Sequence, residues 1–277
     1  MHPERSTRAT RARPRLAAAL AGIALCLAPL LSTAAGPAAV PRTPPRLRVL
    51  FVGNSYTYVN DVPDLVAGVA AARGVELVPG MVAEPNFSIE DHLRRRDYEN
   101  ALAQGWDWVV LQQGPSSLPE NQEILRVQAG RAATLARARG IRVALFAAWP
   151  ALDNAHTWAA AELSYRNAAR ANGLCVLPVS IAWRFARERA PVVSLYAQDR
   201  LHASPEGSLL AALVLAQGLL GQPHYVEPPD LSRLLPSQGW GGALGRIELL
   251  DTLARDALQA EPARCFLGKR ERVQPPR

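Results

Sequence analysis

The sequence predicts an α/β fold of three layers, in which helices cover both faces of a mostly parallel, five-stranded sheet. Apolar segments of strand length alternate with longer helical segments between residues 47 and 222, and this alternation with short connections is typical of a parallel sheet. The strand segments are almost continuously apolar, as expected when both faces of each strand are buried. A chain of 277 residues, 49% of them apolar, can bury such a core.

The elements follow one another in a regular order. The expected strands are Leu47–Gly53, Val75–Val82, Trp108–Gln112, Arg142–Ala148 and Cys175–Val179. The expected helices are Val62–Arg73, Ile89–Gln104 in one or two pieces, Gln122–Arg139, Thr157–Ala171 and Pro205–Leu220. A glycine closely follows each of the first four helices, and glycine often ends a helix because it adopts positive φ without strain. Beyond Gly221 proline and glycine are more frequent, so we expect residues 223–277 to be an irregular C-terminal extension packed on or beside the domain.

The first 35 residues have the composition of a secretory signal peptide, and residues 36–46 form a proline-rich connector. Five arginines precede an uncharged apolar run, Leu16–Leu31, and the small residues Ser32–Ala35 follow it. The run is shorter than the ~20 residues of a membrane-spanning helix, so we expect a leader that is removed and not a retained membrane anchor. The protein is then expected to be secreted or periplasmic, with no stable membrane insertion after removal of the leader.

Charge, motifs and cysteines narrow the class of function. The formal charge is +7, and the leader's five arginines and one glutamate account for +4, so about +3 remains, too little to favour nucleic acid as a partner. The sequence holds no GxxxxGK[ST], GxGxxG or HExxH motif, so we expect no cofactor and no metal. Cys175 lies in an apolar run and is expected to be a buried thiol, although an oxidising compartment would permit a bridge to Cys265. That pairing and the oligomeric state stay open.

Ser55 follows the first expected strand, in the run RVLFVGNSYT. Active sites in open α/β sheets lie at the carboxyl ends of the strands. A serine in a tight turn at this place points its hydroxyl into the crevice, and its backbone N–H is available to stabilise an oxyanion. Asparagine and serine also make ordinary turns, and on this segment alone the ordinary turn is the simpler interpretation.

Asp199 and His202 stand three residues apart in the run AQDRLHASPEG, before a helix whose start is signalled by Ser204 and Pro205. A serine hydroxyl becomes a good nucleophile when an imidazole takes its proton and a carboxylate fixes the imidazole tautomer. A turn of this length can bring Asp199 and His202 into hydrogen-bond contact. The alternative is a solvated aspartate and a capping histidine, but a serine at a strand end favours the catalytic interpretation.

The strand that ends in GNSYT and the later Asp-x-x-His together resemble the SGNH (GDSL-type) hydrolase superfamily of serine esterases. Its first block has Gly-Asp/Asn-Ser and its last block has Asp-x-x-His. The resemblance covers about Leu47 to Leu220 and implies an SGNH-like hydrolase domain over residues 47–222 with a flavodoxin-like architecture. It further implies Ser55 as nucleophile, His202 as general base and acid, and Asp199 as the group that orients His202.

The middle blocks of the resemblance concern the oxyanion hole. The family usually places a glycine after the second strand, and Asn86 stands about there, where it can offer its backbone N–H. The third block usually reads Gly-x-Asn, and here VVLQQGPSS gives Gly114 for the glycine and Ser116 at the asparagine position. Gln112 or Gln113 is then the expected source of the missing amide donor.

The resemblance implies an esterase that forms an acyl-enzyme, and the leader places it outside the cytoplasm, where it would meet small-molecule or polysaccharide esters. Among these we favour O-acetyl groups of carbohydrate, because a pocket for a small acyl group needs no large apolar lid and the sequence shows none. Two alternatives stay open. One is a catalytically weakened carbohydrate-binding or cell-envelope assembly protein, which the atypical Asn86 and Ser116 positions motivate; the other is an acyltransferase with the same triad. We expect His92 on a helix surface, and Trp149 in core packing more than in a substrate wall.

Overall fold

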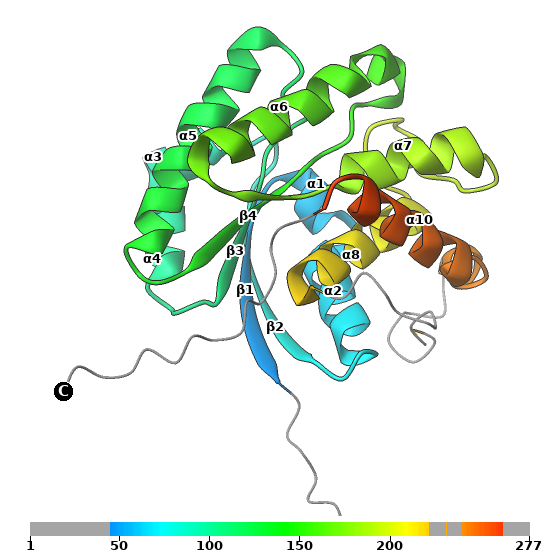
Figure 1. The fold of residues 1–277 in the computed structure, drawn as a ribbon, viewed down its shortest axis with the longest axis horizontal. Helices are drawn as coiled ribbons and strands as arrows, with labels where there is room; N and C mark the ends of the chain where they lie inside the picture. Colours follow the sequence, from blue (N-terminus) through cyan, green and yellow to red (C-terminus); the bar gives the residue numbers. More distant parts are fainter. Residues whose placement is uncertain (1–44, 222–230, 232–239, 263–277) are drawn as a thin grey trace, which may run out of the picture. The chain divides into compact units, whose positions relative to one another are not determined.

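Five parallel strands form the sheet on which the candidate site is built (Figure 1). The computed structural model describes residues 45–221, 231 and 240–262; the expected signal peptide and nearly all of the connector lie outside them. The strands are β1 (Arg46–Gly53), β2 (Glu76–Ala83), β3 (Trp108–Gln112), β4 (Arg142–Phe146) and β5 (Cys175–Leu177). Their order is β2-β1-β3-β4-β5, which is the flavodoxin-like order, so the predicted α/β architecture is confirmed.

Helices cover both faces of this sheet (Figure 1). One layer contains α3 (Ile89–Arg95), α4 (Asp97–Leu102), α5 (Pro119–Arg137) and α6 (Trp158–Asn172). The other layer contains α2 (Val62–Ala71), α7 (Val179–Arg189), α8 (Pro205–Leu220) and α10 (Ile247–Ala260). Short helical segments are α1 (Ser55–Tyr58), η1 (Val59–Asp61), η2 (Leu152–Thr157) and α9 (Gly241–Leu244). None of the helices within the described residues combines the length and apolar character needed to cross a membrane.

The element boundaries differ from the expected ones where the backbone changes direction. The helical segment Ile89–Gln104, expected in one or two pieces, is two helices, because Arg96 takes a left-handed conformation with φ of 64°, and the second helix ends at Leu102. The fifth strand ends at Leu177 and not at Val179, since Pro178 interrupts it and a helix that was not predicted, α7, begins directly afterwards. Cys175, the first residue of β5, takes part in a disulfide and is not a free thiol. Cys265 lies outside the described residues.

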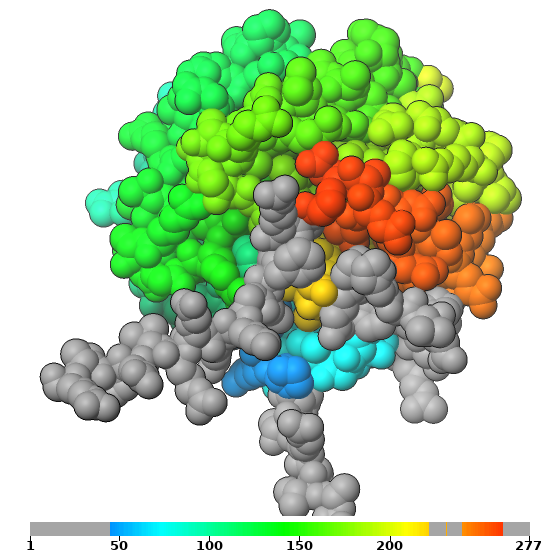
Figure 2. All heavy atoms as spheres, viewed as in Figure 1, coloured from blue at the N-terminus to red at the C-terminus, as the bar shows by residue number. Residues whose placement is uncertain are grey.

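The C-terminal segment is not irregular in the part that the structure describes, which corrects the expectation for residues 241–244 and 247–260. In α10 the buried apolar residues repeat at helical spacing and pack against α7 and α8: Leu250, Leu253, Ala254, Ala257 and Leu258. Every residue of α8 after Pro205 is buried, and a helix that is apolar all round needs cover on every side. Figure 2 shows α10, in orange and red, on the surface of the molecule beside α7.

A buried ion pair and a hydrogen bond hold α10 against α2 and α8 in this helix layer. Arg73, just after α2, donates to Asp251 at 2.8 Å, and the side chains are only 3% and 0% exposed. Gln217 of α8 donates to the same carboxylate at 2.8 Å. Burial raises the pKa of Asp251 above its usual 3.8, although Arg73 and Arg255 both oppose that shift. The cost of removing the carboxylate from water is therefore large, and its partners offset it.

We expect Asp251→Asn to lower the free energy of unfolding by about 3 kcal/mol, because the buried Arg73 guanidinium loses its ion pair. Asp256 is the matched control on the same helix, since it pairs with Arg189 at 3.1 Å in solvent. Asp256→Asn should change stability by less than about 0.5 kcal/mol. Urea unfolding measures both variants, and equal effects would contradict a fastening role for Asp251.

Candidate active site

Ser55 lies at the point of the sheet where the connections between strands switch from one face of the sheet to the other. It lies two residues after the end of β1, the strand between β2 and β3. The connection from β1 to β2 passes through α2 on one face, and the connection from β2 to β3 passes through α3 and α4 on the other. A crevice opens at the carboxyl ends of strands that part in this way. The half-buried Ser55 is thus at the place where this fold usually binds ligands.

Hydrogen bonds on both sides hold the turn that carries Ser55. Asn54 caps α1, with its side chain accepting from Tyr56 N at 3.1 Å and donating to Phe87 O at 2.9 Å. Gln112 at the end of β3 accepts at 2.9 Å from both Asn54 N and Thr57 Oγ1. These contacts leave Ser55 at the first position of α1, where a backbone N–H has no carbonyl partner within the helix.

Gly53 is required before this turn because the space beside it is filled. A Cβ atom on Gly53 would lie 2.3 Å from Gln112 Oε1 and 2.6 Å from Thr57 Oγ1. The same packing explains Gln112, which also donates to Gln113 O at 2.7 Å and is 1% exposed. The Gln112 side chain therefore supports the turn that carries Ser55, and its engagement there argues against the expected role as oxyanion donor.

Asp199 and His202 form the hydrogen bond that the sequence predicts. Asp199 Oδ2 lies 2.5 Å from His202 Nδ1, and Asp199 Oδ1 accepts from the backbone N–H groups of Leu201 at 3.0 Å and His202 at 2.9 Å. The His202 side-chain contact, followed by these two backbone N–H groups, lowers the pKa of Asp199 from 3.8 to about 2. An ionised Asp199 holds the proton of a neutral His202 on Nδ1, which leaves Nε2 as a proton acceptor.

The loop that carries this pair is tied to the carboxyl edge of the sheet. Trp149, after β4, donates to Leu201 O at 3.1 Å, and Leu152 N donates to Arg200 O at 2.8 Å. From the segment after Ser55, Asn60 Nδ2 donates to Ala203 O at 2.9 Å. These contacts fix the His202 loop on the side of the sheet where β1 ends.

Ser55 and His202 lie at the same end of the sheet, and no hydrogen bond joins them within the described residues. The ring of Tyr56, one residue after Ser55, lies 6.4 Å from the ring of His202 between centroids. Catalytic hydrogen bonds often shorten only when substrate binds. The geometry therefore places both residues at one end of the sheet.

Three backbone N–H groups lie at the ends of neighbouring strands and are available to an oxyanion. In the part of the chain that the structure describes, the N–H groups of Ser55, Asn86 and Gly114 have no hydrogen-bond partner. Asn86 is exposed and has φ of 63°. Glycine is the usual residue in this left-handed region, and asparagine is among the few other residues that tolerate it. The backbone at Asn86 thus has the conformation expected of the glycine it replaces.

Gln113 and Ser116 are placed differently from the expectation. Gln113 Nε2 donates to Ser116 Oγ at 3.0 Å, and Ser116 Oγ donates to Gly114 O at 3.0 Å. Gln113 Oε1 accepts from Ile89 N at 3.3 Å. Both side chains bond to the surrounding loops, so we no longer assign them an oxyanion role. The buried Tyr165, which no sequence motif indicates, supports the same loop by donating to Gln113 O at 2.6 Å.

Two further expectations have clear outcomes. The prediction that Trp149 belongs to core packing is confirmed, since it is 0% exposed and stacks on Trp183 with centroids 3.7 Å apart. The prediction that His92 lies on a helix surface is wrong, because its side chain is completely buried. The described residues contain no group of three or more His, Cys, Asp or Glu side chains that could hold a metal ion.

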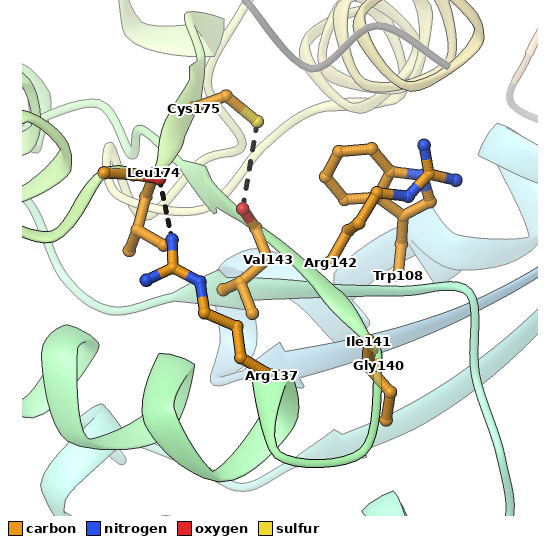
Figure 3. A pocket seen from close by; sticks show the side chains of 9 residues that line it. Trp108, Arg137, Gly140, Ile141, Arg142, Val143, Leu174 and Cys175 are labelled. Atoms are coloured by element: carbon orange, nitrogen blue, oxygen red, sulfur yellow. Dashed lines mark hydrogen bonds between the residues drawn. The ribbon is translucent and has the colours of Figure 1, made fainter. Parts of the chain in front are cut away.

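A pocket of about 580 Å³ lies at the opposite end of the sheet (Figure 3). Its lining includes Trp108, Arg142 and Cys175, the first residues of β3, β4 and β5. The Arg142 guanidinium lies 4.4 Å from the Trp108 ring centroid, and the sulfur of Cys175 lies 3.9 Å from Val143 O. This pocket is at the amino edge of the strands, so it is separate from the site around Ser55.

Comparison with known proteins agrees with this fold. No model of a protein family matches the sequence, and none of the curated proteins matches it. The structure is similar to that of a protein from Slackia heliotrinireducens assigned to the SGNH hydrolases, with 26% identity, a TM-score of 0.52, and coverage of 62% of this chain and 98% of that one. It is also similar to a DUF4886 family protein from Bacteroides uniformis, with 16% identity, a TM-score of 0.62, and coverage of 77% and 95%.

The second likeness shows the fold alone, because its sequence identity is low. The first extends to a protein assigned to a hydrolase class and covers nearly all of that protein. The chain thus resembles the SGNH (GDSL-type) hydrolases in fold, as its motifs predicted, and this resemblance supports an ester hydrolase.

If Asn86 acts through its backbone N–H, its side chain is dispensable. Asn86→Gly keeps the N–H and accommodates φ of 63°, so ester hydrolysis should stay within about threefold of wild type. Asn86→Val keeps the N–H but disfavours that conformation, and it should lower kcat by about tenfold or more. Steady-state kinetics measure both, and a large loss in Asn86→Gly would instead assign the role to the side chain.

The lowered pKa of Asp199 predicts a defined pH dependence of stability. Because the folded-state pKa lies below the ordinary value, the Asp199–His202 bond stabilises the fold fully above about pH 4 and loses this effect as the pH falls to about 2. The difference in unfolding free energy between wild type and Asp199→Asn should shrink over that range. Urea titrations at several pH values measure it, and a difference that stays constant down to pH 2 would contradict the assignment.

Proposed function

We propose that this protein is an exported serine esterase with Ser55, His202 and Asp199 as its triad. The observation that carries the proposal is the 2.5 Å contact between Asp199 and His202 Nδ1, in a loop fastened to the strand end where Ser55 lies. The free N–H groups at neighbouring strand ends supply the electrostatic part of the chemistry. Export rests on the composition of residues 1–35, which lie outside the described residues.

The mechanism follows from the roles of these atoms. Ser55 Oγ attacks the ester carbonyl while His202 Nε2 takes the hydroxyl proton. The backbone N–H groups of Ser55, Asn86 and Gly114 stabilise the negative charge that develops on the carbonyl oxygen. His202 then gives the proton to the departing alcohol, which leaves an acyl group on Ser55. Water, activated by His202 in the same way, releases the acid and restores the serine.

The substrate class that we propose is a short-chain ester, in particular an O-acetyl group on carbohydrate. The side chains of His202 and Asp199 are 27% and 49% exposed, so the reacting groups lie near the surface. Such an open site suits a short acyl group on a large, hydrated alcohol. A long acyl chain would need a deeper pocket that buries it. A transfer of the acyl group to an acceptor other than water would use the same residues.

A second candidate is a catalytically weakened protein that binds carbohydrate or assists in cell-envelope assembly. The observation that favours it is the engagement of Gln113 and Ser116 within their own loop, which leaves the oxyanion to backbone donors. Removing one oxyanion donor typically costs about 2.7–4 kcal/mol of barrier. On this alternative the protein folds and binds sugar but forms no acyl-enzyme.

The test compares ester hydrolysis by wild type, Ser55→Ala and His202→Ala. We expect kcat to fall by about 10³-fold or more in either variant, because triad members act as a unit. A panel of acetyl and longer-chain esters measures the effect and the acyl preference together. A fluorophosphonate probe should label wild type and fail to label Ser55→Ala.

His156→Ala is the matched control, since His156 is an exposed histidine of η2 and should keep wild-type kinetics. Equal activity in wild type and both triad variants would refute the mechanism. Folded wild type that neither labels nor hydrolyses any ester of the panel would favour the binding protein. An acylated sugar product formed only when a sugar acceptor is present would identify an acyltransferase.

A further inference from the structure

We infer that His92, a residue outside the triad, positions the oxyanion hole by holding the peptide that precedes the nucleophile. His92 lies on α3, 39 residues after Gly53 in the sequence, and its Nε2 lies 2.8 Å from Gly53 O. It is 0% exposed, so this contact is shielded from water. This role rests on the proposed function and adds a residue to it.

The tautomer of His92 follows from its surroundings. A carbonyl oxygen can only accept, so Nε2 carries the proton and donates to Gly53. Burial lowers the pKa of His92 below its usual 6.5, against the smaller effects of the Gly53 contact and of the nearby Asp97 and Asp91. The ring is therefore neutral at pH 7, and Nδ1 has no hydrogen-bond partner within the described residues. Among the residues that the structure describes, the imidazole of His92 therefore makes one hydrogen bond, the one to Gly53 O.

The peptide between Gly53 and Asn54 is held at both of its polar atoms. The carbonyl of Gly53 accepts from His92 and also from Glu84 N at 3.2 Å. The N–H of Asn54 donates to Gln112 Oε1 at 2.9 Å. Fixing both atoms sets the plane of this peptide. The next peptide, which carries the N–H of Ser55, is held through Asn54 O, which accepts from Thr57 N at 2.8 Å. Together these contacts set the direction of the Ser55 N–H.

His92 also connects the nucleophile turn with the loop that carries Asn86. Its ring lies 5.1 Å from the ring of Phe87, between centroids, and Phe87 O accepts from the side chain of Asn54 at 2.9 Å. One buried side chain thus contacts the segment before Ser55 and the residue after Asn86. Its loss would alter the spacing between two N–H groups that act on one oxygen atom, and a misplacement of about 1 Å at such a site costs on the order of 100-fold in rate.

The experiment compares His92→Leu with His92→Gln. Leucine fills much of the space and removes the donor, whereas the glutamine carboxamide can replace the imidazole Nε2 as donor to Gly53 O. We expect kcat for a short-chain ester to fall by about 10–100-fold in His92→Leu, with KM changed by less than about threefold. His92→Gln should recover kcat to within about threefold of wild type, which a role in packing alone would not produce.

Asp251→Asn controls for lost stability, because Asp251 lies in the α10 layer and loses a buried ion pair when it is changed. Assayed at a temperature where all variants are folded, it should keep wild-type kcat. Wild-type kcat in His92→Leu, or equal losses in His92→Leu and His92→Gln, would overturn the inference.

Hydrogen–deuterium exchange of the peptide that covers residues 53–58 separates this inference from the proposed function. His92→Leu should exchange faster there than wild type, and His92→Gln should not. If wild type hydrolyses no ester, the effect of His92 on catalysis falls with the proposed function. In that case, faster exchange in His92→Leu would show that the His92–Gly53 contact holds the turn and that only the assigned chemistry is wrong. Unchanged exchange in an active His92→Leu variant would overturn the positioning role alone.

Discussion

The hydrogen bond between Asp199 and His202 is the interaction on which the proposed chemistry of this site depends. A histidine acts as a general base through one nitrogen only when the proton of the other nitrogen is held. Here the carboxylate that holds it is itself fixed by two backbone N–H groups, so the pair is organised within a turn of four residues. In the proposed mechanism, the other features of the site place Ser55 at the same end of the sheet and supply N–H groups for the charge that the reaction creates.

The sheet order explains why distant segments meet at this place. With β1 between β2 and β3, the loops that follow these three strands converge at one edge, and each contributes one backbone N–H to the candidate oxyanion hole. The His202 loop reaches the same edge because Trp149 and Leu152, after β4, bond to it. Buried polar side chains, chiefly Gln112 and His92, then bind these loops to one another. The site is therefore built mainly from backbone groups held by a polar layer beneath them.

The sequence predicts the strands, most helices and the Asp199–His202 contact because these depend on local patterns. Continuous apolar runs mark buried strands, and a three-residue spacing suffices for a turn. The roles of Gln112, Gln113 and Ser116 depend on which groups lie beneath them in space, and no local pattern records that. The helix α10 was missed for a different reason: Pro and Gly before it suggested irregularity. Yet α8, apolar on every side, already indicated that a further element must cover it.

The burial of His92 is likewise not recorded in any local sequence pattern. Asp91 precedes it and three arginines, Arg94–Arg96, follow Leu93, so in sequence it resembles a surface residue. Only its place in the fold beside β1 reveals the contact with Gly53.

A crystal structure of the protein inhibited by a small phosphonate would test the account most directly. We predict phosphorus bonded to Ser55 Oγ, with one phosphonyl oxygen about 2.7–3.1 Å from the N–H groups of Ser55, Asn86 and Gly114. An adduct on another residue, or an oxygen that points away from these groups, would contradict it.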